Sequence, residues 1–522
     1  MATAPRPRAS LAIAFGAVML ASSALNNVFV TYYLEVFTQL PPAAFVAGQL
    51  LFACWNAAND PLFGWLSDRS GLRRAAAIRW GGRLWCAAFL LVWFPPLLPP
   101  AAGAPGAGSA AAPSLLLQAL AMLHFTLALC LYDGALTFVE LNHSALLSDN
   151  ALGRTQGERA SANAWAGAAA GLGSGTSLAA FLCWNGAGDL RTFRVFAAAL
   201  AAVCLVIFEA SASVLDGAPA AARPVEQAAS IKSASSADDS ADGKGHSAAA
   251  AMQEPGVPTF RVFLGQVASQ RNFLVFATMS ALQVFDCTFE KNFFAPFLDV
   301  LAPPTSGVAS AASGAQVSVL GVALPRVSAA ELRGVVIGLS FLLPHAITVL
   351  TAPLISSRGL FSVVRGIFLL RLALILAALA VGYASLGPHL VLLFMLANRV
   401  ASEAVCRLTP LVVADIADED AFLHLRPVSV SASLVGTAAF PGKLSQSFAP
   451  ILGYALMPHS ARGGAGARAT TVWALLVGVP LATVVAQLGL WSGAFTLHGA
   501  YLRTIKARAE AGEGEAAVAR ID

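Results

Sequence analysis

The stretch that decides the fold of this chain runs from Trp55 to Arg74 and reads WNAANDPLFGWLSDRSGLRR. If its first half is helical, Asn59 and Asp60 follow Asn56 by three and four positions, so all three point to one side. A carboxylate at the centre of a membrane-spanning helix costs roughly 2.5–3.5 kcal/mol. It is retained where it faces a protein interior or a wet cavity, so Asp60 is a candidate functional residue.

The composition indicates a membrane protein. Of the 522 residues, 57% are hydrophobic and only 11% are charged, and the mean hydropathy is +0.70. A water-soluble chain of this length needs far more polar surface, so we expect a polytopic membrane protein that has the lipid bilayer as a partner. The seven cysteines are dispersed through apolar runs, which predicts packing residues without a disulfide framework or a metal spacing.

The sequence carries no signature of catalysis, of a cofactor or of nucleic-acid binding. It contains no nucleophile elbow, no phosphate-binding loop, no zinc spacing and no basic patch of the kind that binds nucleic acid. We therefore expect neither an enzyme nor a nucleic-acid partner, and no metal or cofactor.

Apolar segments long enough to span a bilayer recur along the chain, since about 20 such residues suffice. Residues 217–260 are instead rich in Ala, Ser, Asp, Gln and Gly and predict a disordered linker. The all-α chain is thereby divided into an N-terminal six-helix bundle (1–216), a C-terminal six-helix bundle (261–497) and a tail (498–522). The twelve expected helices occupy about 10–34, 43–66, 75–97, 114–140, 161–184, 192–215, 271–298, 332–355, 361–384, 388–414, 428–457 and 470–496.

Positive charge is distributed unevenly between the two sides that these helices would connect. Lys and Arg gather in the short segments on the side of the amino terminus, which the positive-inside rule assigns to the cytoplasm. Both termini and the linker are therefore expected in the cytoplasm, and we expect the plasma membrane because no organelle address is visible. The segment from Pro61 to Gly71 has a fainter echo from Pro353 to Gly359, as expected for two halves related by an axis along the membrane normal.

The end of the opening stretch resembles a known family. It reads Gly-x-Leu-x-Asp-Arg-x-Gly-x-Arg-Arg, which resembles the loop between the second and third helices of the major facilitator superfamily. The preceding Asn-Asp-Pro-Leu resembles the sequence at this position in the sugar:cation symporter branch of that superfamily, the melibiose-carrier-like proteins. This resemblance implies a major facilitator fold that carries a small-molecule substrate by alternating access around a central site. The motif positions are Gly64, Asp68, Arg69, Gly71, Arg73 and Arg74.

The resemblance also implies a cation site. Acids in helices two and four form this site in the symporter branch, and Asp60 and Asp133 occupy these positions here. Relatives carry a further acid where this chain has Asn56, so the coupling ion stays open between sodium, a proton and none. A lysine in helix eleven lies close to the acids in relatives, and Lys443 matches it. The expected ion- or substrate-binding residues are Asn56, Asn59, Asp60, Asp133, Thr137 and Lys443.

Simpler interpretations of these three charges stay open at this stage. In one alternative, Asp60 and Asp133 only hydrogen-bond partner helices, and Lys443 extends its ammonium group to a membrane interface. The Lys443 segment is flanked by long apolar stretches, however, and this favours a partner inside the membrane.

Two further groups of charges lie in the second half. Arg399 and Glu403 are four residues apart, the spacing of an ion pair within one helix. Asp286, Glu290 and Lys291 lie close together on helix seven, where they either line a substrate path or neutralise one another.

The segment after helix ten is acidic and resembles a loop of the same symporter branch. It contains Asp415 and Asp418, which we expect to pair with the basic turn at Arg69, Arg73 and Arg74. Such pairs would join the two halves on the cytoplasmic side, at about 1 kcal/mol for each partly exposed pair.

These features predict cation- or proton-coupled symport of a small solute, either sugar-like or another small organic molecule. Relatives in the branch carry sugars, lysolipids and small amino acids, but the first helix here lacks the acid that bacterial relatives use for sugar. Two alternatives stay open: a lysolipid transporter, and a scaffold or receptor that keeps the transporter fold without transport. A scaffold would tolerate the substitution Asp60→Asn, whereas a symporter would not.

Overall fold

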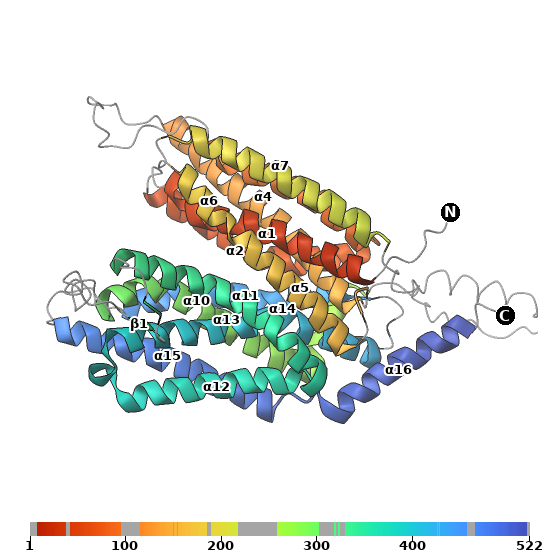
Figure 1. Cartoon of the computed structure of the whole chain (residues 1–522). Helices are drawn as coiled ribbons and strands as arrows, with labels where there is room; N and C mark the ends of the chain where they lie inside the picture. The colour runs from red at the N-terminus through yellow and green to blue at the C-terminus, as the bar shows by residue number, and fades with distance from the viewer. Residues whose placement is uncertain are drawn as a thin grey trace, which may run out of the picture.

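The computed structural model shows two groups of long helices, one formed by the first half of the chain and one by the second (Figure 1). The structure describes residues 8–37, 42–95, 115–149, 151–153, 155–184, 189–217, 258–301, 318–319, 322–323, 329–424, 426, 429–456 and 465–518. Most of the linker expected at 217–260 lies outside these residues.

The N-terminal group follows the apolar segments expected from the sequence. Helices α5 and α6 succeed one another across Gly175 and together form the fifth span. Aromatic side chains fill the centre of this group, where Trp85 and Trp93 are fully buried. The helices are α1 (Arg8–Phe37), α2 (Pro42–Arg69), α3 (Arg74–Val92), α4 (Leu115–Ser148), α5 (Gln156–Ser174), α6 (Thr176–Cys183) and α7 (Arg191–Leu215).

The C-terminal group repeats this plan and has additional elements at its edges. The short α9 (Phe260–Ser269) precedes the first span, α16 (Gly499–Val518) follows the last, and β1 (Ser318–Val319) pairs antiparallel with β2 (Val322–Ala323). The spans are α10 (Arg271–Leu301), α11 (Ala329–Arg358), α12 (Leu360–Val381), α13 (Tyr383–His424), α14 (Ser431–Leu456) and α15 (Ala465–Gly493).

Among the described residues, twelve spans in two groups of six confirm the predicted all-α, multi-pass architecture. Within the described residues, ten spans are long and apolar enough to cross a membrane by length and composition alone. The other two, α2 and α14, contain polar side chains such as Asp60 and Lys443 near their centres. These two helices pack against each other between the groups, so their polar faces are turned toward protein.

Glycines allow α2 and α14 to approach closely. A Cβ atom on Gly64 would lie 2.3 Å from the Ala432 carbonyl oxygen, and one on Gly436 would lie 2.2 Å from the Asp60 carbonyl oxygen. Motif residue Gly64 is therefore needed for helix packing, because any side chain would push the two halves apart. Motif residue Gly71 has a different reason, since its φ of 63° lies in the left-handed region that favours glycine in the turn before α3.

Two helices run further than expected. Helix α4 continues beyond the expected end at 140 to Ser148, and α13 continues beyond 414 to His424. The acidic segment with Asp415 and Asp418 is therefore helical, and the expectation of a loop there is wrong. These polar residues remain helical because side chains of neighbouring elements satisfy them, as described below.

Candidate functional site

Two carboxylates and one ammonium group meet between the halves near the middle of α2. The Nζ atom of Lys443 on α14 lies 3.9 Å from Oδ1 of Asp60 on α2 and 3.8 Å from Oδ1 of Asp133 on α4. It also donates a hydrogen bond of 2.7 Å to Oδ1 of Asn56. The side chain of Lys443 is 20% exposed, whereas those of Asp60 and Asp133 are 5% and 12% exposed. The lysine of one half therefore offsets part of the negative charge of two acids in the other.

The neutral residues predicted for this site lie beside the two acids. Asn59 donates a hydrogen bond of 2.5 Å from Nδ2 to Oδ2 of Asp133. Its Oδ1 atom and the Oγ1 atom of Thr137 are buried and make no hydrogen bond within the described part of the chain. Two carboxylates and two unsatisfied oxygens form the oxygen-rich set that a hard cation prefers. With Lys443 present, the three charged groups keep one net negative charge, which a proton or one monovalent cation would neutralise.

The loop motif joins the halves at the end of the molecule where α1 begins and α15 ends, which we name the terminal face. Asp68, at the end of α2, accepts hydrogen bonds from the backbone N–H of Ser433 at 2.7 Å and from its hydroxyl at 2.6 Å. Arg74 pairs with Asp68 at 2.6 Å and with Asp149 at 2.9 Å. Asp149 in turn accepts a 2.6 Å hydrogen bond from Ser429. Two motif residues, Asp68 and Arg74, thus hold the first residues of α14.

A second polar contact across the terminal face involves an arginine that the sequence pattern did not reveal. Arg159 on α5, only 2% exposed, donates to both oxygens of Asp418 at 2.8 and 3.0 Å and lies 3.4 Å from Asp415. Lys506 on α16 lies 2.8 Å from Asp415. A capping box formed by Thr155 and Glu158 starts α5 one turn earlier and fixes this end of the helix. That sequence signal marks the helix start but not the partner.

The expected pairing of Asp415 and Asp418 with the basic turn is therefore wrong. Arg73 lies 3.2 Å from Asp216 in its own half, and Arg69 stacks over the ring of Trp65. Arg74 pairs with Asp68 and Asp149 as described above. The cause is the length of α13, which carries the acids along a helix toward α5 instead of releasing them into a loop.

The C-terminal half has its own buried charge cluster, centred on Arg371 of α12. This arginine is 1% exposed and lies 2.6 Å from Asp286 and 2.8 Å from Glu290, and it donates to Asn398 at 2.9 Å. The basic partner of Asp286 and Glu290, which lie on α10, thus comes from another helix. A basic residue in the middle of the apolar α12 is a visible signal of a buried ion pair, but only the fold identifies the acids.

A cavity of about 180 Å³ lies between the two halves, toward the terminal face. Helices α1, α4 and α5 contribute one wall, and α11 and α13 contribute the other. Most of its lining is apolar or small. Its chemically distinctive side chains are Glu140, His143, Asn163, His345 and Arg407.

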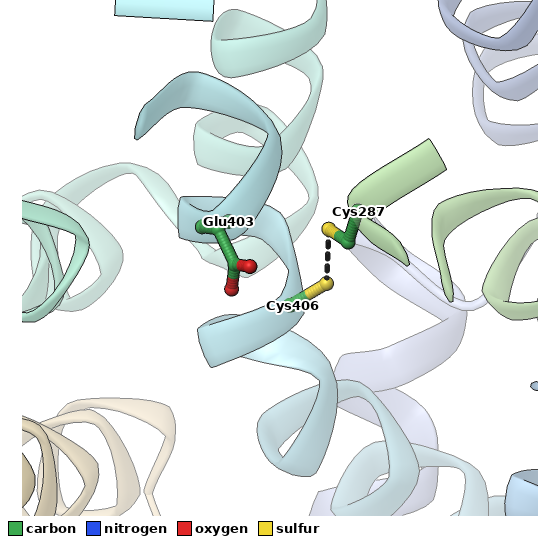
Figure 2. A group of neighbouring side chains, drawn as sticks. All are labelled: Cys287, Glu403 and Cys406. Carbon is green, nitrogen blue, oxygen red and sulfur yellow. Dashed lines mark hydrogen bonds between the residues drawn. The ribbon is translucent and has the colours of Figure 1, made fainter. Parts of the chain in front are cut away.

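Two cysteines and an acid approach one another beside this cavity (Figure 2). The ligand atoms of Cys287 on α10 and of Glu403 and Cys406 on α13 lie within 4.8 Å of one another. The two sulfur atoms are 2.9 Å apart. Two sulfurs at tetrahedral Zn–S bonds of about 2.3 Å would be roughly 3.8 Å apart, so these thiols would have to separate to hold zinc. The ligands come from two helices distant in sequence, so a spacing motif does not show them.

The fold and the loop motif define the class of the protein. A family model described as MFS/sugar transport protein matches residues 10–236. The structure is similar to a bacterial homologue of the iron transporter ferroportin in its outward-facing state, with a TM-score of 0.58 and 16% identity over 94% of this chain and 100% of that one. It is also similar to the E. coli fucose:proton symporter, with a TM-score of 0.55 and 14% identity over 93% and 98%. At such identities the likeness shows the fold alone, which is that of major facilitator transporters.

Two relatives narrow the class further, and both are named transmembrane protein 180. The protein from Mus musculus is 33% identical over 95% of this chain and 94% of its own length. The protein from Gallus gallus is 30% identical over 95% and 94%. The chain belongs to the transmembrane protein 180 family. Its resemblance to the superfamily, first visible in the motif between Trp55 and Arg74, is therefore confirmed.

Proposed function

We propose that the protein is a symporter that moves a small solute by alternating access, coupled to a proton or a sodium ion at Asp60 and Asp133. The observation that carries this proposal is the position of Lys443, whose ammonium lies 3.8–3.9 Å from both acids and belongs to the opposite half. One ammonium balances the charge of only one of the two carboxylates. The second acid leaves a charge that a mobile cation can balance.

The coupling would work by competition for the carboxylates. A proton or sodium ion that binds Asp60 or Asp133 offsets the negative charge of the carboxylate. The carboxylate then attracts the ammonium group of Lys443 less strongly. The unsatisfied oxygens of Asn59 and Thr137 would serve as neutral ligands for sodium. Release of Lys443 loosens the seam between α2 and α14, and this favours the movement of one half relative to the other.

The proposal includes an orientation in the membrane. We place the terminal face in the cytoplasm, with both termini there, and the protein in the plasma membrane. The distribution of Lys and Arg in the short loops supports this orientation. The N-terminal bundle then covers residues 1–216 and the C-terminal bundle residues 261–497, joined by the cytoplasmic linker 217–260 and followed by the tail 498–522.

A test compares ion binding by the purified parent protein and by Asp60→Asn. The melting temperature is measured in sodium chloride and in choline chloride at equal ionic strength, across a range of pH. A specific ligand at a hundred times its Kd stabilises the folded state by about 2.7 kcal/mol. We expect the parent to be stabilised by sodium or by a change of pH, and Asp60→Asn to lose that dependence. Asp216→Asn, which removes an exposed acid, is the control and should behave like the parent.

The opposite result would favour a different function. If neither sodium nor pH changes the stability of the parent beyond that of Asp60→Asn, the acids only hold helices together. The scaffold or receptor alternative would then replace symport.

A further inference from the structure

We propose that the cavity between the halves binds a small zwitterion of the amino-acid class, with its carboxylate on Arg407 and its ammonium on Glu140. This inference rests on the proposed function in one respect, namely that a small solute is carried through the interface. It concerns the substrate and not the coupling ion, which binds at Asp60 and Asp133.

The first observation is an arginine without a partner. Arg407 lines the cavity from α13, and its side chain makes no hydrogen bond or ion pair with any residue that the structure describes. Its Nε atom is buried and unsatisfied. The buried arginines of α13 and α12 differ, since Arg399 lies 3.4 Å from Glu403 and Arg371 holds two acids. A guanidinium in an apolar setting needs an anion, and its planar donors fit a carboxylate in a bidentate manner.

The second observation is an acid on the facing wall. Glu140 lines the same cavity from α4, and its Oε1 accepts a 2.7 Å hydrogen bond from Ser22. No described basic residue lies within ion-pair distance of it. Glu140 and Arg407 influence each other electrostatically across the cavity without direct contact. The two walls therefore present opposite charges, one from each half.

This arrangement selects among ligand classes by charge. A simple carboxylate would satisfy Arg407 but would be repelled by Glu140, and a simple amine would meet the reverse problem. A molecule with both charges satisfies both walls and adds no net charge to a low-dielectric site. Since the ligand would bridge the two halves, its binding would be sensitive to their relative position, as transport requires.

The size and the remaining lining agree with this class. A cavity of about 180 Å³ is slightly larger than an engineered one of about 150 Å³ that holds benzene, so a solute of amino-acid size fits. Met19, Leu147 and Phe15 supply apolar surface for a side chain. The Nδ1 atom of His345, buried and unsatisfied within the described residues, offers one more polar contact.

The test measures binding to the purified full-length protein by thermal shift and calorimetry. The probes are the neutral L-amino acids from glycine to phenylalanine. For each one that binds, we also test the deaminated carboxylate and the decarboxylated amine, such as 4-methylpentanoate and 3-methylbutylamine for leucine. D-glucose represents the sugar alternative. We expect at least one amino acid to bind, and each single-charge analogue to bind on the order of tenfold or more weakly.

The variants assign the contacts. Arg407→Gln and Glu140→Gln should each lower amino-acid affinity on the order of 10- to 100-fold, because each removes a charge-assisted hydrogen bond. Arg407→Lys keeps the charge and should retain more affinity than Arg407→Gln. The Arg407→Lys variant therefore also controls for misfolding. Arg503→Gln, on the exposed surface of α16, is the matched control and should bind like the parent.

The inference is overturned if no neutral amino acid binds, if a single-charge analogue or glucose binds as well as the amino acid, or if Arg407→Gln binds like the parent. Its failure is separable from that of symport. In one outcome, amino-acid binding depends on Arg407 but uptake into proteoliposomes does not change with sodium or pH. This result would support the zwitterion site and reject ion coupling. Ion dependence that is lost in Asp60→Asn, without any amino-acid binding, would keep coupling and reject the zwitterion.

Discussion

The contact between Asp68 and α14 makes a measurable prediction about how firmly the terminal face is closed. In the structure, the carboxylate of Asp68 accepts two short hydrogen bonds from Ser433, which belongs to the other half. These bonds exist only while the halves are together at this face. Its pairing with Arg74 lies within one half and is present whether the face is open or closed. The substitution Asp68→Asn therefore acts on the opening equilibrium mainly through Ser433.

The size of the effect follows from the strength of hydrogen bonds to a charged group, about 1.5–3 kcal/mol each. Asparagine keeps one acceptor oxygen but loses the charge, so we expect a loss of about 2–3 kcal/mol from the closed state. That corresponds to roughly a 30- to 150-fold shift in the equilibrium. If about 1% of the parent is open, roughly a quarter to three-fifths of Asp68→Asn would be open.

Spin labels at Leu72 and Leu423 measure this directly. Both residues lie near the terminal face, in opposite halves, and they are 38% and 49% exposed, so labels there do not disturb packing. Pulsed electron resonance should show a single short distance in the parent and an added longer one in Asp68→Asn. Asp216→Asn, which breaks an exposed ion pair inside one half, should keep the parent distribution. An unchanged distribution in a folded Asp68→Asn protein would refute the view that the motif closes this face.

Three further substitutions test other parts of the structure. Lys443→Gln should increase the affinity for sodium or protons, because two acids then lack their counter-charge, and the same salt and pH series of melting temperatures measures it. Gly436→Ala should destabilise the protein by about 1–3 kcal/mol in chemical unfolding, because its Cβ would collide with the Asp60 carbonyl, whereas Gly489→Ala has open space and should not destabilise. Arg371→Met should cost about 3–5 kcal/mol in the same assay by leaving Asp286 and Glu290 buried without their base, and a smaller loss would show that these acids are neutral in the folded state.

The fold could be predicted from the sequence because its strongest signals are local. Twelve apolar segments and one polar linker region define two bundles, and the motif around Asp68 identifies the superfamily. The carboxylate inside α2 also indicated that this helix faces a protein interior or a wet cavity, because a charge that faces lipid is costly. The boundaries were weaker, because α4 and α13 extend through polar residues whose partners lie in distant segments.

Contacts between charged residues could be predicted only in part from the sequence. The approach of Lys443 to Asp60 was expected from a resemblance to known symporters, and the spacing of residues does not contain it. Arg159 and Arg371 were missed because an arginine in a helix does not reveal which acid it meets. The cavity pair Glu140 and Arg407 belongs to the same category, since the two residues are brought together only when α4 and α13 pack.

The seam between α2 and α14 connects the features that an alternating-access cycle requires. Asp60 and Asp68 lie two helical turns apart on α2, about 12 Å along its axis. They contact Lys443 and Ser433 on α14 respectively, and the glycine contacts lie between them. The glycine contacts are so close that α2 and α14 move as packed units. If the helices separate at Asp60 and Lys443, the contact between Asp68 and Ser433 must therefore change as well. We therefore expect cation binding at Asp60 to weaken the hold of Asp68 on the terminal face.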